Sequence, residues 1–163
     1  YINHVCISTD GRLLASCSDD GTIRIWDVDG KKEYPVLKGH SASVNRVEFS
    51  MDGKKLVSFS TDRTVRVWDV GHGVELHRLS GHLSDITVAR FVNNDRIVVT
   101  CSNDKTIRLW NAENGQLEAL YFAKCRVTDI KWIEGAAATY LYTVGLRQKV
   151  NVPVIQKLLV NGY

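Results

Sequence analysis

Three ten-residue segments of this chain are near copies of one another, and they recur at one fixed interval. They read SDDGTIRIWD at residues 18–27, STDRTVRVWD at 60–69 and SNDKTIRLWN at 102–111. The tryptophan near the end of each copy follows the previous one by 42 residues, at Trp26, Trp68 and Trp110. Self-similarity at a fixed period indicates that each copy folds as one small unit, which buries its apolar surface against its neighbours.

A second mark keeps the same step. The dipeptide Gly-His occurs at Gly39-His40 and again 42 residues later at Gly81-His82. A repeat of about 40–45 residues that combines Gly-His with Trp-Asp predicts four short strands per unit, arranged as the blade of a β-propeller. The spacing therefore constrains the fold far more than it constrains the biochemistry.

The second repeat shows how one unit divides into strands. Short runs rich in β-branched residues are separated by Asp-Gly or Gly turns, a pattern typical of an antiparallel meander. We expect strands at 44–49, 54–60, 64–69 and 74–79. In the third of these, Val65 and Val67 point to one side, while Arg66 and Trp68 point to the other. Both faces carry bulk, which indicates a sheet packed between two neighbours.

With these marks the chain resembles the WD-repeat β-propellers, whose repeats run Gly-His, a variable stretch, Ser or Thr, Asp and then Trp-Asp. The resemblance covers residues 1–122 closely and 123–163 weakly. It implies an all-β fold of propeller blades, each a four-stranded antiparallel sheet, with three well-formed repeats and a degenerate fourth. We expect the first blade at 1–38, without the loop that leads into its first strand, and the others at 39–79, 80–122 and 123–163.

The two ends of the chain depart from the pattern. One period before His40 falls ahead of Tyr1, so the chain begins after its first Gly-His would occur. In the last unit 127–132 fits a first strand, but Arg147 replaces the repeat's Asp and Pro153 its Trp. Proline cannot donate to a sheet ladder, so we expect an edge or irregular strand there. We predict an arc of a larger propeller, with a four-bladed ring and a pairing of two arcs as alternatives, and with open blade flanks that favour self-association.

The resemblance also implies a buried, hydrogen-bonded tetrad of His, Ser or Thr, Asp and Trp in each blade. The groups suit such a series, because an indole N–H only donates, a hydroxyl passes the bond on, and a neutral imidazole both donates and accepts. A carboxylate then ends the series. The second repeat supplies His40, Ser58, Asp62 and Trp68, the third supplies His82, Thr100, Asp104 and Trp110, and the first supplies Ser16, Asp20 and Trp26 without a histidine.

Serine, histidine and aspartate together also fit a hydrolase triad, which needs an exposed nucleophile beside an oxyanion site. The trio occurs twice in register, however, and threonine replaces serine in one copy. An active site is normally unique, whereas a structural device repeats with its unit. We therefore predict that the chain is not an enzyme and needs no cofactor. The recurring Arg24, Arg66 and Arg108 are interpreted as packing residues, and His72 and His77 as loop and strand residues rather than zinc ligands.

Charge and cysteine usage narrow the classes of function. The net charge of +3 is small and the basic residues are scattered, so we expect neither nucleic acid nor a membrane as a partner. Cys6, Cys17, Cys101 and Cys125 form no C-x-x-C pair, and Cys17 and Cys101 share a repeat position with Phe59. Reduced core cysteines are the resulting interpretation, and they favour an intracellular setting, cytoplasmic rather than nuclear.

The function predicted from these features is a non-catalytic scaffold for protein–protein interaction, because a rigid scaffold that displays loops suits recognition. The end with the Gly-His loops and the Asp turns varies most between copies. The candidate partner-binding residues at that end are Asp19, Ser43, Thr61, Arg63, Ser84, Asp85, Asn103 and Lys105.

Two other settings remain open for such a scaffold. One is the regulatory propeller of a multidomain signalling NTPase of the apoptosome type. The other is a substrate receptor of a cullin ubiquitin ligase, whose adaptor-binding box resembles Trp-Asp-x-Arg. In this chain the last place of that box holds Asp29, Gly71 and Glu113, so no copy has the basic residue and this setting ranks lowest.

Overall fold

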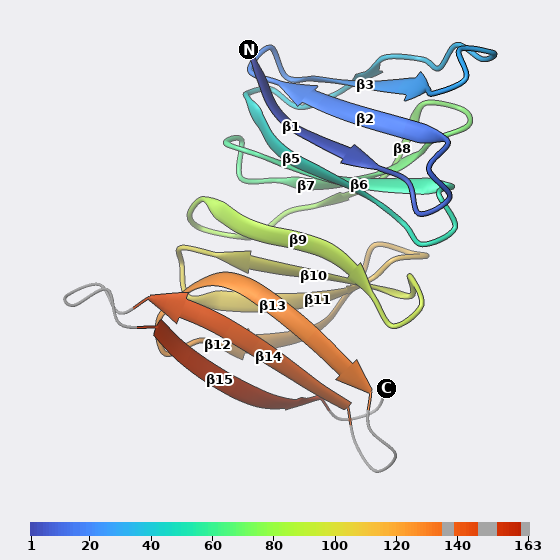
Figure 1. The fold of residues 1–163 in the computed structure, drawn as a ribbon. Helices are drawn as coiled ribbons and strands as arrows, with labels where there is room; N and C mark the ends of the chain where they lie inside the picture. Colours follow the sequence, from blue (N-terminus) through green and yellow to red (C-terminus); the bar gives the residue numbers. More distant parts are fainter. Residues whose placement is uncertain (135–138, 147–152, 161–163) are drawn as a thin grey trace.

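The computed structural model describes residues 1–134, 139–146 and 153–160. Within these residues the chain forms fifteen β-strands in four antiparallel sheets, which are stacked one after another (Figure 1). None of the described residues belongs to a helix long and apolar enough to cross a membrane. The all-β architecture of repeated four-stranded sheets, predicted from the 42-residue period, is confirmed.

Each of the first three sheets is a meander of four strands, in which neighbours along the chain are neighbours in the sheet. Sheet 1 contains β1 (Ile2–Ile7), β2 (Leu13–Ser18), β3 (Thr22–Asp27) and β4 (Leu37–Lys38). Sheet 2 contains β5 (Val44–Phe49), β6 (Lys55–Ser60), β7 (Val65–Asp69) and β8 (Val74–Leu79). Sheet 3 contains β9 (Ile86–Val92), β10 (Ile97–Ser102), β11 (Thr106–Asn111) and β12 (Leu117–Phe122).

The fourth sheet departs from the other three. Its described part has three strands, in the order β13 (Arg126–Glu134), β14 (Thr139–Leu146) and β15 (Pro153–Val160). Pro153 opens the edge strand β15 and pairs with Leu146, in agreement with the expected place of a proline in a sheet. Arg147, which replaces the repeat's Asp, lies outside the described residues.

Successive sheets pack face to face, and we call the side of a sheet toward the preceding sheet its front face and the other side its back face. The front face of sheet 2 carries Val44, Val47, Leu56 and Trp68, all almost fully buried against the back face of sheet 1. The residues 42 positions later pack in the same way against sheet 2, and they are Ile86, Ala89, Val98 and Trp110. A third apolar cluster joins sheets 3 and 4. The 42-residue repeat of the sequence therefore places the same positions in each junction between the first three sheets.

The first strand of every sheet begins with a β-bulge, which leaves one residue outside the ladder. In two junctions this residue donates to the next sheet. The amide of Asn3 donates to the carbonyl oxygen of Val44 at 3.0 Å, and the hydroxyl of Thr87 donates to that of Val127 at 2.7 Å. The bulges thus tie neighbouring sheets together at one end.

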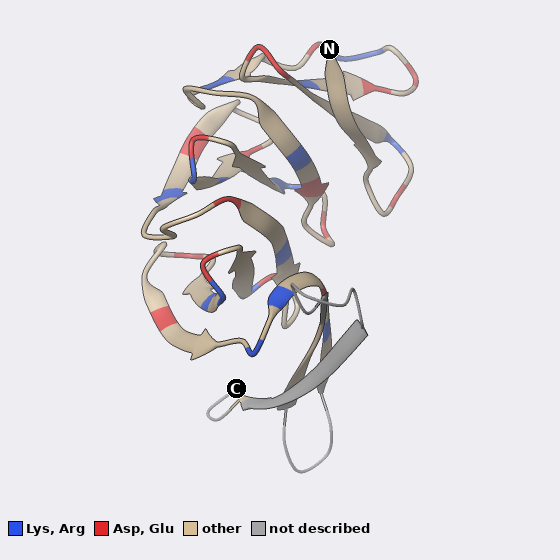
Figure 2. Cartoon of the chain, turned by 90° about the vertical axis from the view of Figure 1, so that its left-hand side faces the viewer, with Lys and Arg blue, Asp and Glu red and all other residues tan. Residues whose placement is uncertain are grey.

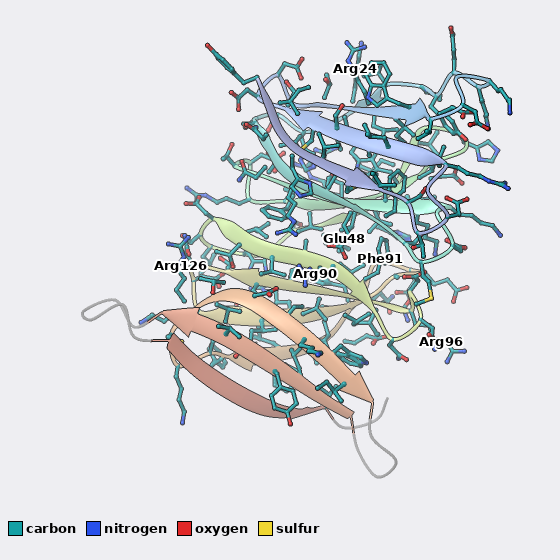
Figure 3. The ribbon with its side chains drawn as sticks, viewed as in Figure 1. Arg24, Glu48, Arg90, Phe91, Arg96 and Arg126 are labelled. Atoms are coloured by element: carbon teal, nitrogen blue, oxygen red, sulfur yellow. The ribbon has the colours of Figure 1, made fainter. Side chains whose placement is uncertain are left out.

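Ion pairs cross the first strands of three sheets. Nε of Arg90 on β9 lies 3.3 Å from Oε2 of Glu48 on β5, and Nη1 of Arg90 lies 3.2 Å from Oδ1 of Asp129 on β13. Figure 3 shows Glu48 and Arg90 approaching each other between sheets 2 and 3. Burial raises the pKa of Glu48, although the positive charges of Arg90 and Arg46 oppose the shift. One arginine therefore links three successive sheets.

The predicted interior of the repeat is also confirmed at the cysteine position. Cys17, Cys101 and Phe59 share this position, and all three are buried. The four cysteines of the chain are free thiols. Burial raises the pKa of Cys6 and of Cys17 to about 11, so both thiols stay protonated at neutral pH.

Candidate interaction surface

Sheet 2 brings together the four polar groups of the predicted tetrad. Nε1 of Trp68 donates to Oγ of Ser58 at 2.8 Å, and Oγ of Ser58 lies 2.8 Å from Nε2 of His40. Nδ1 of His40 then lies 2.8 Å from Oδ2 of Asp62, whose other oxygen accepts from Thr64. The series runs from β7 through β6 to the loop before β5 and the turn after β6.

Sheet 3 repeats the same series with threonine in place of serine. Nε1 of Trp110 donates to Oγ1 of Thr100 at 2.9 Å, and Oγ1 lies 2.8 Å from Nε2 of His82. Nδ1 of His82 lies 3.0 Å from Oδ2 of Asp104. The backbone N–H of Leu83 also donates to that oxygen at 2.9 Å, so the carboxylate fixes the loop that follows the histidine.

In sheet 1 the structure brings together only two of the three predicted groups. Nε1 of Trp26 donates to Oγ of Ser16 at 3.2 Å. Asp20 is exposed and accepts from the backbone and the hydroxyl of Thr22 instead. Without a histidine between them, the carboxylate and the hydroxyl have no group that connects them. Trp26 is 50 % exposed, against 1 % for Trp68.

The hydrogen bonds fix the protonation state of the buried imidazoles. Because the ionised carboxylate of Asp62 can only accept, the imidazole proton lies on Nδ1 of His40, and Nε2 then accepts from the hydroxyl of Ser58. Burial lowers the pKa of His40 and of His82, although the neighbouring carboxylates oppose this shift. Burial would raise the pKa of Asp62, but hydrogen bonds from Thr64 and His40 outweigh it and lower the pKa to about 2. At neutral pH the series therefore contains a neutral imidazole and an ionised carboxylate.

Acidification is expected to weaken the fold in two stages. The lowered pKa of His40 and His82 means that their contribution to stability is full above the ordinary pKa of 6.5 and is lost as the pH falls below it. The pKa of Asp62 is lowered from 3.8 to about 2. Protonation of its carboxylate between these two pH values therefore lowers the free energy of unfolding by a further ~2 kcal/mol. Denaturant unfolding over this pH range measures both stages. The double variant His40→Gln/His82→Gln should lack the first stage, and a wild-type stability that stays flat from pH 7 to pH 5 would contradict the assignment.

The geometry of the tetrads differs from that of a hydrolytic site. Ser58 and Thr100, the two hydroxyls in the nucleophile's place, are each 0 % exposed. Both hydroxyls already bond an indole on one side and an imidazole on the other. An acyl-transfer nucleophile needs access to a substrate carbonyl beside an oxyanion site, and neither buried hydroxyl offers it.

The recurring arginines lie against the glycine that precedes each tetrad histidine. The guanidinium of Arg66 lies against Gly39, where a Cβ would overlap it, and pairs with Glu75. Arg108 lies against Gly81 in the same way and donates to its carbonyl oxygen at 2.9 Å. Each guanidinium also lies 6.0 Å from the ring centre of the tetrad indole two residues further on, within cation–π range. The arginines of sheets 2 and 3 therefore pack, as predicted.

The two remaining histidines singled out in the sequence make separate local contacts. Nδ1 of His72 lies 3.0 Å from Oδ1 of Asp69 in the same turn. Nε2 of His77 lies 2.9 Å from the carbonyl oxygen of Glu113 and so joins sheets 2 and 3. Across the part of the chain that the structure describes, no group of three His, Cys, Asp or Glu side chains is placed to hold a metal ion.

All the candidate partner-binding residues lie in the turns after β2, β6 and β10 or in the loops before β5 and β9. These turns and loops lie at the end of the sheets that Figure 2 faces. The side chains of two of them, Asp19 and Ser43, are hydrogen-bonded at the junction of sheets 1 and 2. Asn3 donates to Oδ1 of Asp19 at 2.8 Å, and the hydroxyl of Ser43 donates to the same oxygen at 2.7 Å. A further one, Ser84, offers its backbone carbonyl to the hydroxyl of Ser102 at 3.0 Å. These three residues thus hold the loops in place.

Two other candidates are exposed cations on a constrained backbone. Arg63 and Lys105 follow the tetrad aspartates, and both have a left-handed conformation, with φ of 63° and 65°. Gly21 stands at the same repeat position in sheet 1, with φ of 81°. The left-handed conformation costs a non-glycine residue roughly 1–2 kcal/mol. The strained residue in each of these two turns, in sheets 2 and 3, carries a basic side chain.

The last three candidates line one cavity. Thr61, Asp85 and Asn103 surround a hollow of about 360 Å³ where sheets 2, 3 and 4 meet. Oδ1 of Asn103 is buried there and has no hydrogen-bond partner within the protein. Sequence reasoning did not single out the other residues of the lining, Asn45, Ile86, Thr87, Arg126 and Thr128. Three of them occupy the bulge position of the first strand, and that shared position is the signal that could have identified them.

The chain matches the WD40 family, described as "WD domain, G-beta repeat", over residues 1–27, 31–69 and 73–111. These three segments make up more than half of the chain. They contain β1 to β11 and every residue of the predicted tetrads. The family match thus covers the part of the chain in which the repeat is well formed.

Three curated relatives each match the chain over about the length of one repeat. The general transcriptional corepressor TUP1 of Saccharomyces cerevisiae is 43 % identical over 44 residues, which is 27 % of this chain and 6 % of that protein. The WD repeat-containing protein 3 homolog of Dictyostelium discoideum is 46 % identical over 43 residues, 26 % of this chain and 5 % of that protein. A probable E3 ubiquitin ligase complex SCF subunit sconB of Aspergillus clavatus is 39 % identical over 46 residues, 28 % and 7 % of the two chains. The matches thus span less than a tenth of each relative's length.

Proposed function

The chain belongs to the WD40 repeat family, and from this premise we propose that it is a non-catalytic protein-interaction scaffold, which docks a partner at the end bearing the Gly-His loops. The cavity lined by Thr61, Asp85 and Asn103 is the observation that carries the proposal. It lies where three sheets meet, and its walls offer hydroxyl, amide and carboxylate groups. A rigid framework that holds such loops in place suits recognition, because little conformational entropy is lost on binding.

The charges around this cavity indicate the chemistry of the partner. Arg63, Lys105 and Arg126 are exposed at this end over sheets 2 to 4. Sheet 1 instead presents the exposed carboxylates of Asp19 and Asp20. Figure 2 shows both signs of charge on this face. A partner segment with acidic side chains over sheets 2 to 4 fits this distribution, and complementary charge of this kind acts mainly on the rate of association.

The cellular setting of the scaffold also belongs to the proposal. Open flanks at both ends of the stack favour an arc of a larger propeller, and free buried cysteines favour an intracellular, cytoplasmic location. The regulatory propeller of a signalling NTPase remains the first alternative. One observation supports the ubiquitin-ligase alternative: a relative that matches the chain over a single repeat is named as an SCF subunit.

Alanine substitution at the cavity and its rim is the test of the docking end. We expect Thr61→Ala, Arg63→Ala, Asp85→Ala and Asn103→Ala each to weaken partner capture at least several-fold. The melting temperature should change little, because surface substitutions usually shift stability within about 0.5 kcal/mol. Affinity capture from cell extract followed by titration of the purified partner measures the effect. The Arg63→Ala defect should shrink at high salt, where screening already weakens the wild-type contact.

The opposite end of the sheets provides the matched control. A larger hollow of about 750 Å³ lies there, lined by Met51, Lys55, Arg96 and Glu113 among others, and Figure 3 shows Arg96 at this end. Lys55→Ala and Arg96→Ala should leave partner capture unchanged. If these two variants lose the partner while the four cavity variants keep it, the docking end has been assigned to the wrong side of the scaffold.

A further inference from the structure

The junctions between neighbouring sheets have three equivalent positions at the end that bears the Gly-His loops. These positions are the bulge residue of the first strand, the residue before the repeat's Asp, and the residue at the entry to the next sheet. The residues are Asn3, Asp19 and Ser43 between sheets 1 and 2, Asn45, Thr61 and Asp85 between sheets 2 and 3, and Thr87, Asn103 and Arg126 between sheets 3 and 4. The second and third sets line the cavity of about 360 Å³.

The first junction is closed by its own side chains. Nδ2 of Asn3 donates to Oδ1 of Asp19 at 2.8 Å and to Oγ of Ser43 at 2.9 Å. The hydroxyl of Ser43 donates to the same carboxylate oxygen at 2.7 Å. The hydrogen bonds from Asn3 and Ser43 lower the pKa of Asp19. A planar NH₂ group therefore fills the space between a carboxylate and a hydroxyl in this junction.

The second junction contains the same three kinds of group, with the carboxylate and the hydroxyl exchanged. Thr61 stands at the position of Asp19, and Asp85 stands at the position of Ser43. The hydroxyl of Thr61 donates to the backbone carbonyl of Ser43 at 3.4 Å rather than to a side chain. Within the part of the chain that the structure describes, no hydrogen bond joins the side chains of Asn45, Thr61 and Asp85. An exposed carboxylate is thus left in the wall of the cavity.

The first junction indicates which chemical group fits this carboxylate. A planar group with N–H donors bonds the carboxylate there, and a guanidinium offers the same planar donors together with a positive charge. An arginine side chain pairs with a carboxylate through two parallel hydrogen bonds, which the compact ammonium of lysine cannot form. The cavity volume of about 360 Å³ lies near the lower end of the range for ligand sites, which suits a single inserted side chain.

Basic side chains around the cavity set a second requirement. Arg126 lines the cavity from β13, and Figure 3 shows it at this end of the sheets. Arg63 and Lys105 are exposed on the turns after β6 and β10, which also contribute to the lining. We call these three side chains the basic rim. The rim repels an isolated cation, so an arginine that enters the cavity needs acidic neighbours in its own chain.

We propose that the cavity receives an arginine side chain of a partner protein, which pairs with Asp85, while acidic residues beside that arginine pair with the basic rim. A partner segment of this mixed charge accounts for a carboxylate in the cavity wall as well as for the cations around it. The inference rests on the proposed function, because it takes this end as the docking end. It adds the identity of the inserted group.

Titration with short peptides tests the inserted group. The probe is the capped peptide Asp-Arg-Asp, compared with peptides that have lysine or citrulline in place of arginine. Binding is followed by the NMR shifts of the protein's backbone amides. The arginine peptide should shift the amides of Thr61 and Asp85 with a roughly millimolar Kd. It should bind at least about fivefold more tightly than the other two. Equal affinity for either replacement, or no shift at these amides, would overturn the proposal.

A matched pair of variants tests the role of the carboxylate. Asp85→Asn keeps the size of the side chain and removes its charge, and it should weaken the arginine peptide about tenfold. Asp20→Asn removes an exposed carboxylate from the corresponding end of sheet 1 and should leave the affinity unchanged. Both variants should keep the circular dichroism spectrum of the wild type. Wild-type affinity in a folded Asp85→Asn variant would show that this carboxylate does not hold the arginine.

Partner capture distinguishes a failure of this inference from a failure of the proposed function. If Thr61→Ala and Asn103→Ala lose the partner and Asp85→Asn keeps it, the docking end is correct and the inserted arginine is wrong. If all three variants keep the partner while the wild type still binds the arginine peptide, the docking end is wrong and the arginine site is correct. Loss of the partner in all three variants, together with binding of the arginine peptide, supports both.

Discussion

Replacing Trp68 with alanine is expected to lower the free energy of unfolding by about 3–5 kcal/mol, the usual range for a fully buried tryptophan. Trp68 is 1 % exposed and lies in the apolar cluster between sheets 1 and 2. Its indole N–H also starts the hydrogen-bond series through Ser58 and His40. The substitution would leave a cavity in a junction and a buried hydroxyl without its donor, and both effects act in the same direction. Chemical denaturation followed by circular dichroism measures the loss.

The chain contains its own control for this experiment at the same repeat position. Trp26 is 50 % exposed and donates to Ser16 at the longer distance of 3.2 Å. Trp26→Ala should therefore cost only about 1 kcal/mol. If Trp26→Ala and Trp68→Ala lower the unfolding free energy equally, then burial between sheets is not what the repeated tryptophan provides.

The 42-residue period was enough to predict the sheets because each repeat carries the same local signals. The Asp-Gly turn before β6 and the β-branched strand β7 specify a meander without reference to the rest of the chain. The alternation along β7 also indicated that both faces are covered, since Val67 and Trp68 on opposite sides are both buried. Local patterns of this kind survive in a single sequence, and the fold could be read from them.

Contacts between repeats could not be predicted in the same way. The bridge from Glu48 through Arg90 to Asp129 joins three sheets, and the sequence only shows that these residues lie on first strands. Which side chains meet depends on the angle and offset between neighbouring sheets. A repeat pattern contains no information on that geometry. For the same reason the bond from Asn3 to Ser43 in the next repeat could not be predicted.

The contact between the glycine before each tetrad histidine and the arginine of the same repeat is a second feature that could not be predicted. Both Gly81 and Arg108 recur with the period, and each was singled out separately. The contact between them spans 27 residues and places the guanidinium where a side chain at the glycine would lie. Only the closure of the loop before β9 onto β11 brings the two together. The periodicity shows that both positions recur, and the structure shows that they are in contact.

The candidate interaction surface was predicted only in part. Variation between copies pointed to Thr61, Asp85 and Asn103, which line one cavity. It also pointed to Asp19 and Ser43, whose side chains are engaged with each other and with Asn3. Variation alone does not separate a loop residue that holds a junction from one that faces outward. That distinction requires the hydrogen bonds.

Replacing His40 with alanine is expected to lower the free energy of unfolding by about 1–3 kcal/mol through buried groups left without partners. His40 connects the hydroxyl of Ser58 to the carboxylate of Asp62, and both connections are 2.8 Å long. Its side chain is 0 % exposed, and that of Asp62 is 5 % exposed. Water therefore cannot easily replace the imidazole. Thermal or denaturant unfolding measures the change.

The matched control is His77→Ala, which removes a half-buried imidazole outside the tetrad from the same sheet. His77 makes one bond, to the carbonyl oxygen of Glu113 at 2.9 Å, so its loss should stay within about 0.5 kcal/mol. A double-mutant cycle between His40→Ala and Asp62→Ala isolates the pair, because the two residues are in direct contact. Coupling between them, together with a lowered melting temperature, is the expected signature of a structural tetrad. An unchanged melting temperature in His40→Ala with the disappearance of a hydrolytic activity would show that the repeated histidine serves chemistry rather than the fold.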